Sequence, residues 1–161
     1  MKKTTHMTGL FVFTLVTSIT LGFGASVFAH KGATGVVKQR MEEMKEMKGR
    51  LKQIDKMLVG KTAYNDQKLR KSLDYIRDHA GARMTRLFPK GTAHKPSEAD
   101  PEIWNNWAEF DKMALQLNHS TDDFRARLPD GKADKKTRKS LQASYLALRK
   151  SCKICHDRFR E

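Results

Sequence analysis

Two cysteines and a histidine near the end of the chain have the residue types and spacing for chemistry. Cys152 and Cys155 are the only cysteines, they stand three residues apart, and His156 follows directly in the run SCKICHDRFR. Such a group could form a disulfide, bind zinc, act as a redox pair or attach a haem. Which of these applies depends on the elements that carry the residues.

Three of these four chemistries fit the sequence poorly. A disulfide between residues i and i+3 of a helix has poor geometry and closes almost no loop. A structural zinc site needs four ligands, and His30, His79, His94 and His119 show no ligand spacing. A thioredoxin-like redox pair belongs in a βαβ context, and the sequence contains no convincing strand.

Covalent attachment of haem c is the remaining chemistry. In a C-x-x-C-H run the thiols form thioether bonds to the haem, and the histidine binds the iron. On a helix, Cys152 and Cys155 face the same side, and His156 lies one turn from Cys152. The sequence therefore predicts one covalently attached haem c (iron) per chain, with His156 as an axial ligand.

Four amphipathic segments must position this motif. Apolar residues recur every three or four positions along residues 34–58, 65–87, 101–128 and 133–159, which is the period of a helix with one buried face. The connections are short except for a proline-rich crossover at 88–101. This pattern predicts an all-α, antiparallel four-helix bundle with the haem near the C-terminus of the fourth helix. Four aromatic residues should pack the core and the haem: Trp104, Trp107, Phe110 and Phe159.

The N-terminus has the pattern of a secretory signal peptide. Two lysines precede an apolar stretch that ends in an A-x-A-like site at Ala29, as signal peptidase requires. A retained membrane anchor is the alternative. We therefore expect a signal peptide at 1–29, a single domain at 30–161 and a periplasmic location.

The chain is strongly basic, with 32 Lys and Arg against 18 Asp and Glu. Export and the lack of any nucleic-acid motif argue against a nucleic-acid partner. The charge indicates a solvated surface, with some steering towards an acidic redox partner or transient contact with an anionic membrane. A haem-free basic bundle that binds such partners is a further interpretation. No paired carboxylates, phosphate loop or nucleophile–base pattern suggests an enzyme.

The domain resembles the cytochrome c-prime family over residues 36–161. The resemblance rests on CHDRFR at the C-terminus, on LFPKG and PEIW around the crossover, and on KQRMEEMKEM in the first helix. In that last run, Arg40 precedes Met44 by four residues. The resemblance implies that Arg40 lies beside the haem, near a propionate or the distal pocket, and that Met44 faces the open side of the iron. Arg160 is a second candidate for a propionate.

The residue on the open side decides between two functions. Methionine ligation gives a low-spin haem suited to electron transfer, as in the c-556 branch of the family, whereas a vacant site binds NO or CO. Met44 favours an exported electron carrier with His/Met ligation, and the gas-binding cytochrome c-prime is the alternative. Met41 and Met47 lie on the same stripe and are the other candidate ligands. The family also implies a possible homodimer through the first two helices.

Overall fold

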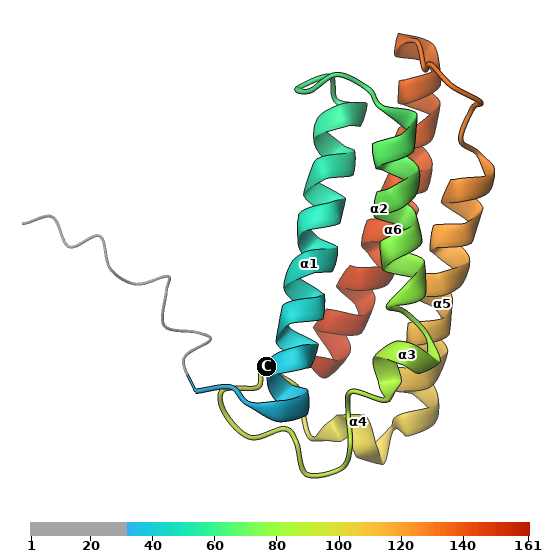
Figure 1. Ribbon diagram of the computed structural model, residues 1–161. Coiled ribbons are helices and arrows are strands. Elements are labelled where there is room, and N and C mark those ends of the chain that lie inside the picture. Colours follow the sequence, from blue (N-terminus) through green and yellow to red (C-terminus); the bar gives the residue numbers. More distant parts are fainter. Residues whose placement is uncertain (1–31) are drawn as a thin grey trace, which may run out of the picture.

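Four main helices run antiparallel in the computed structural model, which describes residues 32–161 (Figure 1). They are α1 (Gly35–Leu58), α2 (Asp66–Asp78), α5 (Trp107–Ala126) and α6 (Lys135–Phe159). Two short helices, α3 (Ala82–Thr85) and α4 (Glu102–Asn105), flank the crossover between α2 and α5. The all-α four-helix bundle predicted from the sequence is confirmed. The predicted signal peptide at 1–29 lies outside the described residues.

Local signals at the short turns set the bounds of the main helices. The Asn65 side chain accepts a hydrogen bond from the Lys68 amide at the start of α2, and the Asp134 side chain accepts one from the Thr137 amide at the start of α6. Such caps satisfy amides that have no partner within the helix. Gly60 follows α1 with φ at 79°, a conformation that glycine adopts without steric cost. None of the helices in residues 32–161 is long and apolar enough to cross a membrane.

The second predicted helix, over 65–87, is interrupted. α2 ends at Asp78, and α3 begins directly after Gly81, whose φ is 57°. The Gly81 amide donates to the Ala114 carbonyl on α5 at 3.0 Å, and a Cβ at Gly81 would lie 3.3 Å from the Asn118 side chain. This close approach between α5 and the end of α2 replaces the continuous helix. The third predicted helix is likewise divided, because the backbone bends between α4 and α5.

The apolar stripes of the helices meet in one core, as the helical period predicts. Several of its largest side chains are fully enclosed: Ile54, Leu69, Ile103, Phe124 and Leu148. Burying each such side chain contributes roughly 1.5–3 kcal/mol. The core therefore fixes the positions of α1 and α6, the two helices that carry the predicted haem ligands.

Replacing Leu148 with alanine is expected to lower the free energy of unfolding by about 3 kcal/mol, because the side chain has no exposed surface and its loss leaves a cavity. Leu146 lies on the same helix but is 58% exposed. Leu146→Ala should therefore change stability by about 0.5 kcal/mol or less. Urea denaturation of the two variants measures the difference, and equal losses would contradict this packing of α6.

Candidate haem site

The final turns of α6 carry the cysteine–histidine motif. Cys152 and Cys155 are free, partly buried and packed against the core, whereas His156 lies at the surface. This placement follows from the spacing, since residues three apart on a helix share a face. Both thiols are thus held on the inner side of α6, as the haem prediction requires.

Burial sets the protonation states of the two thiols and of the imidazole in the motif. Burial raises the pKa of the Cys152 thiol, and burial together with the nearby Cys152 raises the pKa of Cys155 to about 11. Desolvation, followed by the charge of Arg160, lowers the pKa of His156. At neutral pH the thiols stay protonated, which does not favour thiolate ligation of a metal, and the neutral imidazole keeps the lone pair that an iron ligand needs. Within residues 32–161, no three His, Cys, Asp or Glu side chains form a metal centre of protein ligands alone.

Arg40, on the first turns of α1, is buried with 4% of its surface exposed. Its guanidinium donates hydrogen bonds to the carbonyl of Leu87, directly before the crossover, at 3.2 Å, and to two residues of the crossover: to the carbonyl of Thr92 at 2.8 Å and to Oγ of Ser97 at 2.6 Å. The same group lies 4.4 Å from the centroid of the Phe88 ring. Arg40 therefore fastens the crossover to the start of α1.

The charge of Arg40 has no counter-ion in the part of the chain that the structure describes, because none of the ion pairs there includes it. Burial lowers the pKa of Arg40, and a buried charge without a partner is costly. A carboxylate of the kind that haem carries would pair with a guanidinium in this position. The unpaired charge at the start of α1 therefore fits a haem propionate, while both terminal nitrogens of Arg40 already donate to the protein.

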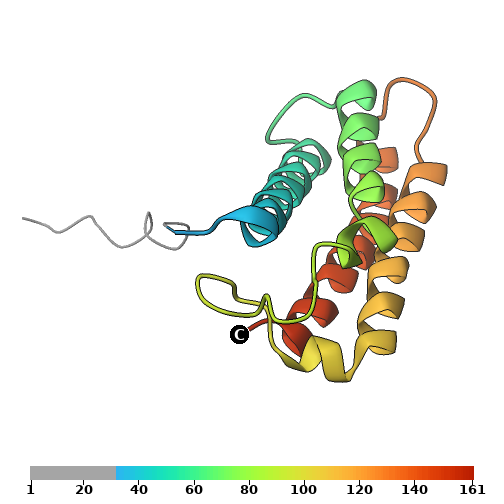
Figure 2. The ribbon, with the colours of Figure 1, turned by 60° about the horizontal axis from the view of Figure 1, so that its bottom comes forward.

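A series of aromatic contacts joins Arg40 to the haem motif. The ring of Phe88, beneath the guanidinium, packs edge-on against Phe110 with centroids 4.7 Å apart, and Phe110 packs edge-on against Phe159 at 5.5 Å. Phe159 follows His156 by three residues on α6. The start of α1 and the end of α6 also lie at the same end of the bundle in both ribbon views (Figures 1 and 2). The structure thus brings Arg40 and the haem motif together.

The other predicted aromatic residues differ in burial. Trp104 is partly buried, and its indole N–H donates to the Phe88 carbonyl at 3.0 Å. Trp107 is 40% exposed, so its prediction as a core residue was wrong, while its predicted contact with the haem stays a prediction. Trp107 is the first residue of α5, and its ring contacts that of Phe110 with centroids 5.6 Å apart.

The C-terminus is tied to the crossover by contacts that the sequence analysis missed. The Asp100 amide donates to the Phe159 carbonyl at 3.0 Å, and the Glu161 amide donates to the Glu98 carbonyl at 3.0 Å. Arg160, the second candidate for a propionate, pairs with the Glu98 carboxylate at 2.6 Å. Most of these partners are backbone groups, which leave no signal in a sequence.

The three candidate methionines of α1 have different surroundings. Met47 is 7% exposed and belongs to the core, whereas Met44 is partly buried and packs against it. Met41 is partly buried but is not among the residues packed against the core. Met44 also follows Arg40 by one turn on the same face of α1. It therefore lies at the border of the core, as Cys152 and Cys155 do on α6.

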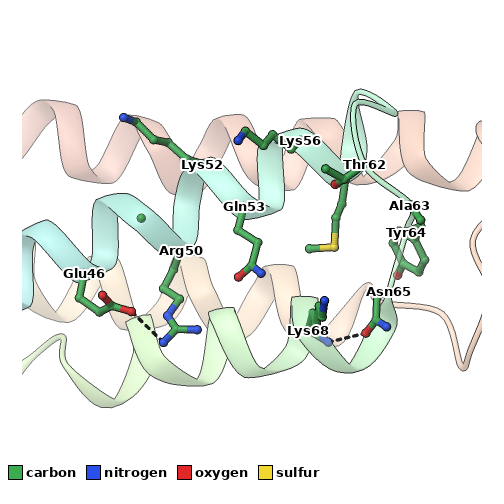
Figure 3. Close-up of a pocket in the computed structure, with 12 residues that line it drawn as sticks. Glu46, Arg50, Lys52, Gln53, Lys56, Thr62, Ala63, Tyr64, Asn65 and Lys68 are labelled. Atoms are coloured by element: carbon green, nitrogen blue, oxygen red, sulfur yellow. Dashed lines mark hydrogen bonds and ion pairs between the residues drawn. The ribbon is translucent and has the colours of Figure 1, made fainter.

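A cleft of about 750 Å³ lies elsewhere, between the second half of α1 and the start of α2 (Figure 3). Its lining includes Glu46, Arg50, Gln53 and Tyr64 but neither cysteine nor histidine. The Arg50 guanidinium is already paired with the Glu46 carboxylate at 2.7 Å. The cleft therefore has no part in the candidate haem site.

Arg40→Ala is expected to lower the free energy of unfolding by about 3 kcal/mol, because it leaves buried acceptors of the crossover without their charged donor. Arg77, whose partly exposed guanidinium pairs with Asp78 at 3.0 Å, is the matched control. Arg77→Ala should cost about 0.5 kcal/mol or less. Urea denaturation of both holoproteins measures the two losses of stability. A small loss for Arg40→Ala would mean that the hydrogen bonds between Arg40 and the crossover contribute little to stability.

Comparisons with known proteins identify the family of this chain. The sequence model of the family described as Cytochrome C' matches residues 35–160. A cytochrome c' from Rhodopseudomonas palustris is 29% identical over 150 residues, which cover 92% of this chain and 94% of the relative. A cytochrome c-556 from Agrobacterium tumefaciens is 27% identical over 126 residues, 78% of this chain and 97% of the relative. The solved structure of the R. palustris cytochrome c' superposes with a TM-score of 0.69 and covers 80% of this chain and 98% of that one. The chain therefore belongs to the cytochrome c' family, and covalently attached haem c is its cofactor.

Proposed function

We propose that this protein is an exported electron carrier that holds haem c through Cys152 and Cys155, with His156 and Met44 as axial ligands. The observation that carries the proposal is the position of Met44, one turn after the buried Arg40 and at the border of the core. A thioether sulfur is a soft ligand suited to haem iron. When bound, haem c supplies a one-electron Fe(III)/Fe(II) couple.

The other residues of the site have supporting roles in this proposal. Arg40 would bind a haem propionate while it holds the crossover, since its charge has no other counter-ion in residues 32–161. Phe110 and Phe159 are buried to 2% and 3% exposure and would exclude water from one side of the haem. Such an apolar shell helps to set the reduction potential.

The wider setting is also part of the proposal. The pattern of residues 1–29 favours export, and cytochromes of this family are periplasmic. The partner would be a redox protein, without nucleic acid and without an enzymatic reaction on this chain. Homodimerisation stays a prediction. It has a parallel in one cytochrome c' of the same fold, 16% identical, whose structure is described as having ligand-controlled dimer dissociation.

Gas binding at a vacant or weakly held sixth site is the second candidate function. The similarity to a cytochrome c' of R. palustris supports it. A mutant of the cytochrome c prime from Alcaligenes xylosoxidans, which has the same fold and is 23% identical, has been solved as a nitric oxide complex. Met44 is only partly buried, so its sulfur could be displaced by a strong ligand.

Absorption spectra of the purified holoprotein distinguish the two functions. We expect the reduced protein to show a six-coordinate low-spin spectrum that does not change when CO is added, because a methionine occupies the sixth position. A high-spin spectrum that changes readily with CO would reject the electron-carrier proposal in favour of gas binding.

A further inference from the structure

The end of the bundle opposite the haem motif is strongly basic. The turns at 59–65 and 127–134 lie at this same end in both ribbon views (Figures 1 and 2). Residues 52–71 and 125–139, called here the basic end, contain thirteen Lys and Arg against four Asp. Residues 83–112, around the crossover, contain five of each sign. The positive charge of the protein is therefore concentrated away from the haem.

The lysines of the basic end are available for a partner. All nine are exposed, and none is in an ion pair within residues 32–161: Lys52, Lys56, Lys61, Lys68, Lys71, Lys132, Lys135, Lys136 and Lys139. The acidic residues there are partly engaged, since Asp66 pairs with Arg70 at 2.7 Å and Asp134 caps α6. The cations thus form a field that neighbouring carboxylates do not neutralise.

Most of these lysines do not share a pocket. They are spread over two turns and the adjoining helix ends. Lys52, Lys56 and Lys68 line the cleft shown in Figure 3, and the other six lie outside it. Flexible ammonium groups spread in this way suit a diffuse anionic surface better than a single phosphate or carboxylate.

An exposed apolar residue lies among these charges. Val59 is 48% exposed at the end of α1, between Lys56 and Lys61 in the sequence. Apolar side chains flanked by lysines enter the boundary between lipid head groups and acyl chains, while the lysines stay at the head groups. Val59 therefore lies where a bilayer surface would receive an apolar side chain.

We propose that the basic end binds the surface of a bilayer that contains anionic phospholipids, with Val59 inserted among the head groups. Lys139 and Cys155 are 16 residues apart on α6, so roughly 24 Å separates them along the helix. An acidic redox partner held at the basic end would lie that far from the haem. A bilayer held there leaves the haem end free for such a partner, whichever ligand occupies the sixth position.

Vesicle co-sedimentation of the mature holoprotein tests the proposal. We expect binding to vesicles of phosphatidylcholine with phosphatidylglycerol and none to phosphatidylcholine alone, with affinity that falls as salt is added. Each lysine near an anionic bilayer strengthens binding roughly fivefold. The triple variant Lys135→Gln, Lys136→Gln, Lys139→Gln should therefore bind about 100-fold more weakly.

A control variant tests whether vesicle binding depends on where the lysines lie or only on the net charge of the protein. Lys45, Lys48 and Lys112 are exposed and lie outside the basic end, so their triple replacement with glutamine removes the same charge. This control should bind vesicles as the unchanged protein does. Equal losses in the two triple variants, or no binding of the unchanged protein to anionic vesicles, would overturn the proposal. An unchanged haem spectrum and circular dichroism check that each variant is folded.

Replacing Val59 distinguishes binding to a bilayer from binding to an acidic polypeptide. Val59→Ser should weaken binding to anionic vesicles several-fold, because the apolar insertion is lost, and should not change binding to polyglutamate at the same ionic strength. If Val59→Ser leaves vesicle binding unchanged and polyglutamate binds as tightly as the vesicles do, the occupant is an acidic polypeptide and the lipid proposal is wrong.

Discussion

Met44→Ala should convert the reduced protein from a six-coordinate low-spin to a five-coordinate high-spin haem and open it to CO. The replacement removes the thioether of Met44, which lies one turn after Arg40 on the same face of α1 and at the border of the core. Loss of a thioether ligand should also lower the reduction potential. Absorption spectra with and without CO, together with a redox titration, measure these changes.

The two neighbouring methionines are the controls for this result. Met47 belongs to the core and Met41 is not packed against it, so Met41→Ala and Met47→Ala should both stay low-spin. Met47→Ala should instead lose stability, because it leaves a cavity. If Met44→Ala stays low-spin and either Met41→Ala or Met47→Ala becomes high-spin, the methionine replaced in that high-spin variant is the axial ligand.

The double variant Cys152→Ser, Cys155→Ser should retain no covalently bound haem. Serine has nearly the shape of cysteine but forms no thioether bond, so the change removes the attachment and little of the packing. Extraction with acid and acetone, followed by the absorption spectrum of the remaining protein, measures covalent haem directly. Ser151→Ala, beside the motif on α6, should keep the full amount. Haem that resists extraction from the double variant would show attachment at another residue.

The helical period predicted the bundle because burial of one face dominates the energetics of each main helix. It missed the interruption after α2 because Ala80 and Met84 are still buried, at 3% and 4% exposure. The break is caused by a tertiary contact, the approach of Gly81 to Ala114 and Asn118. The apolar pattern along one helix does not predict such a contact with another helix.

The candidate site was predictable where its residues are neighbours in the sequence. The C-x-x-C-H run predicted haem c once its helical setting and the lack of other ligand spacing had excluded the alternatives, whereas Arg40 and Met44 were found only through resemblance to a family. Nothing in the sequence indicated that Arg40 would donate to carbonyls of the crossover, because every residue has a carbonyl. The burial of Trp107 was overestimated because its place in an apolar stripe does not reveal that it begins a helix on the outer side.

The crossover's contacts with both ends of the domain also bear on the order of folding. Arg40 bonds Ser97 across 57 residues, and Arg160 bonds Glu98 across 62. Closing loops of this length costs more chain entropy than pairing α1 with α2 or α5 with α6 across their short turns. We therefore expect the helical hairpins to form early and the haem end to close late.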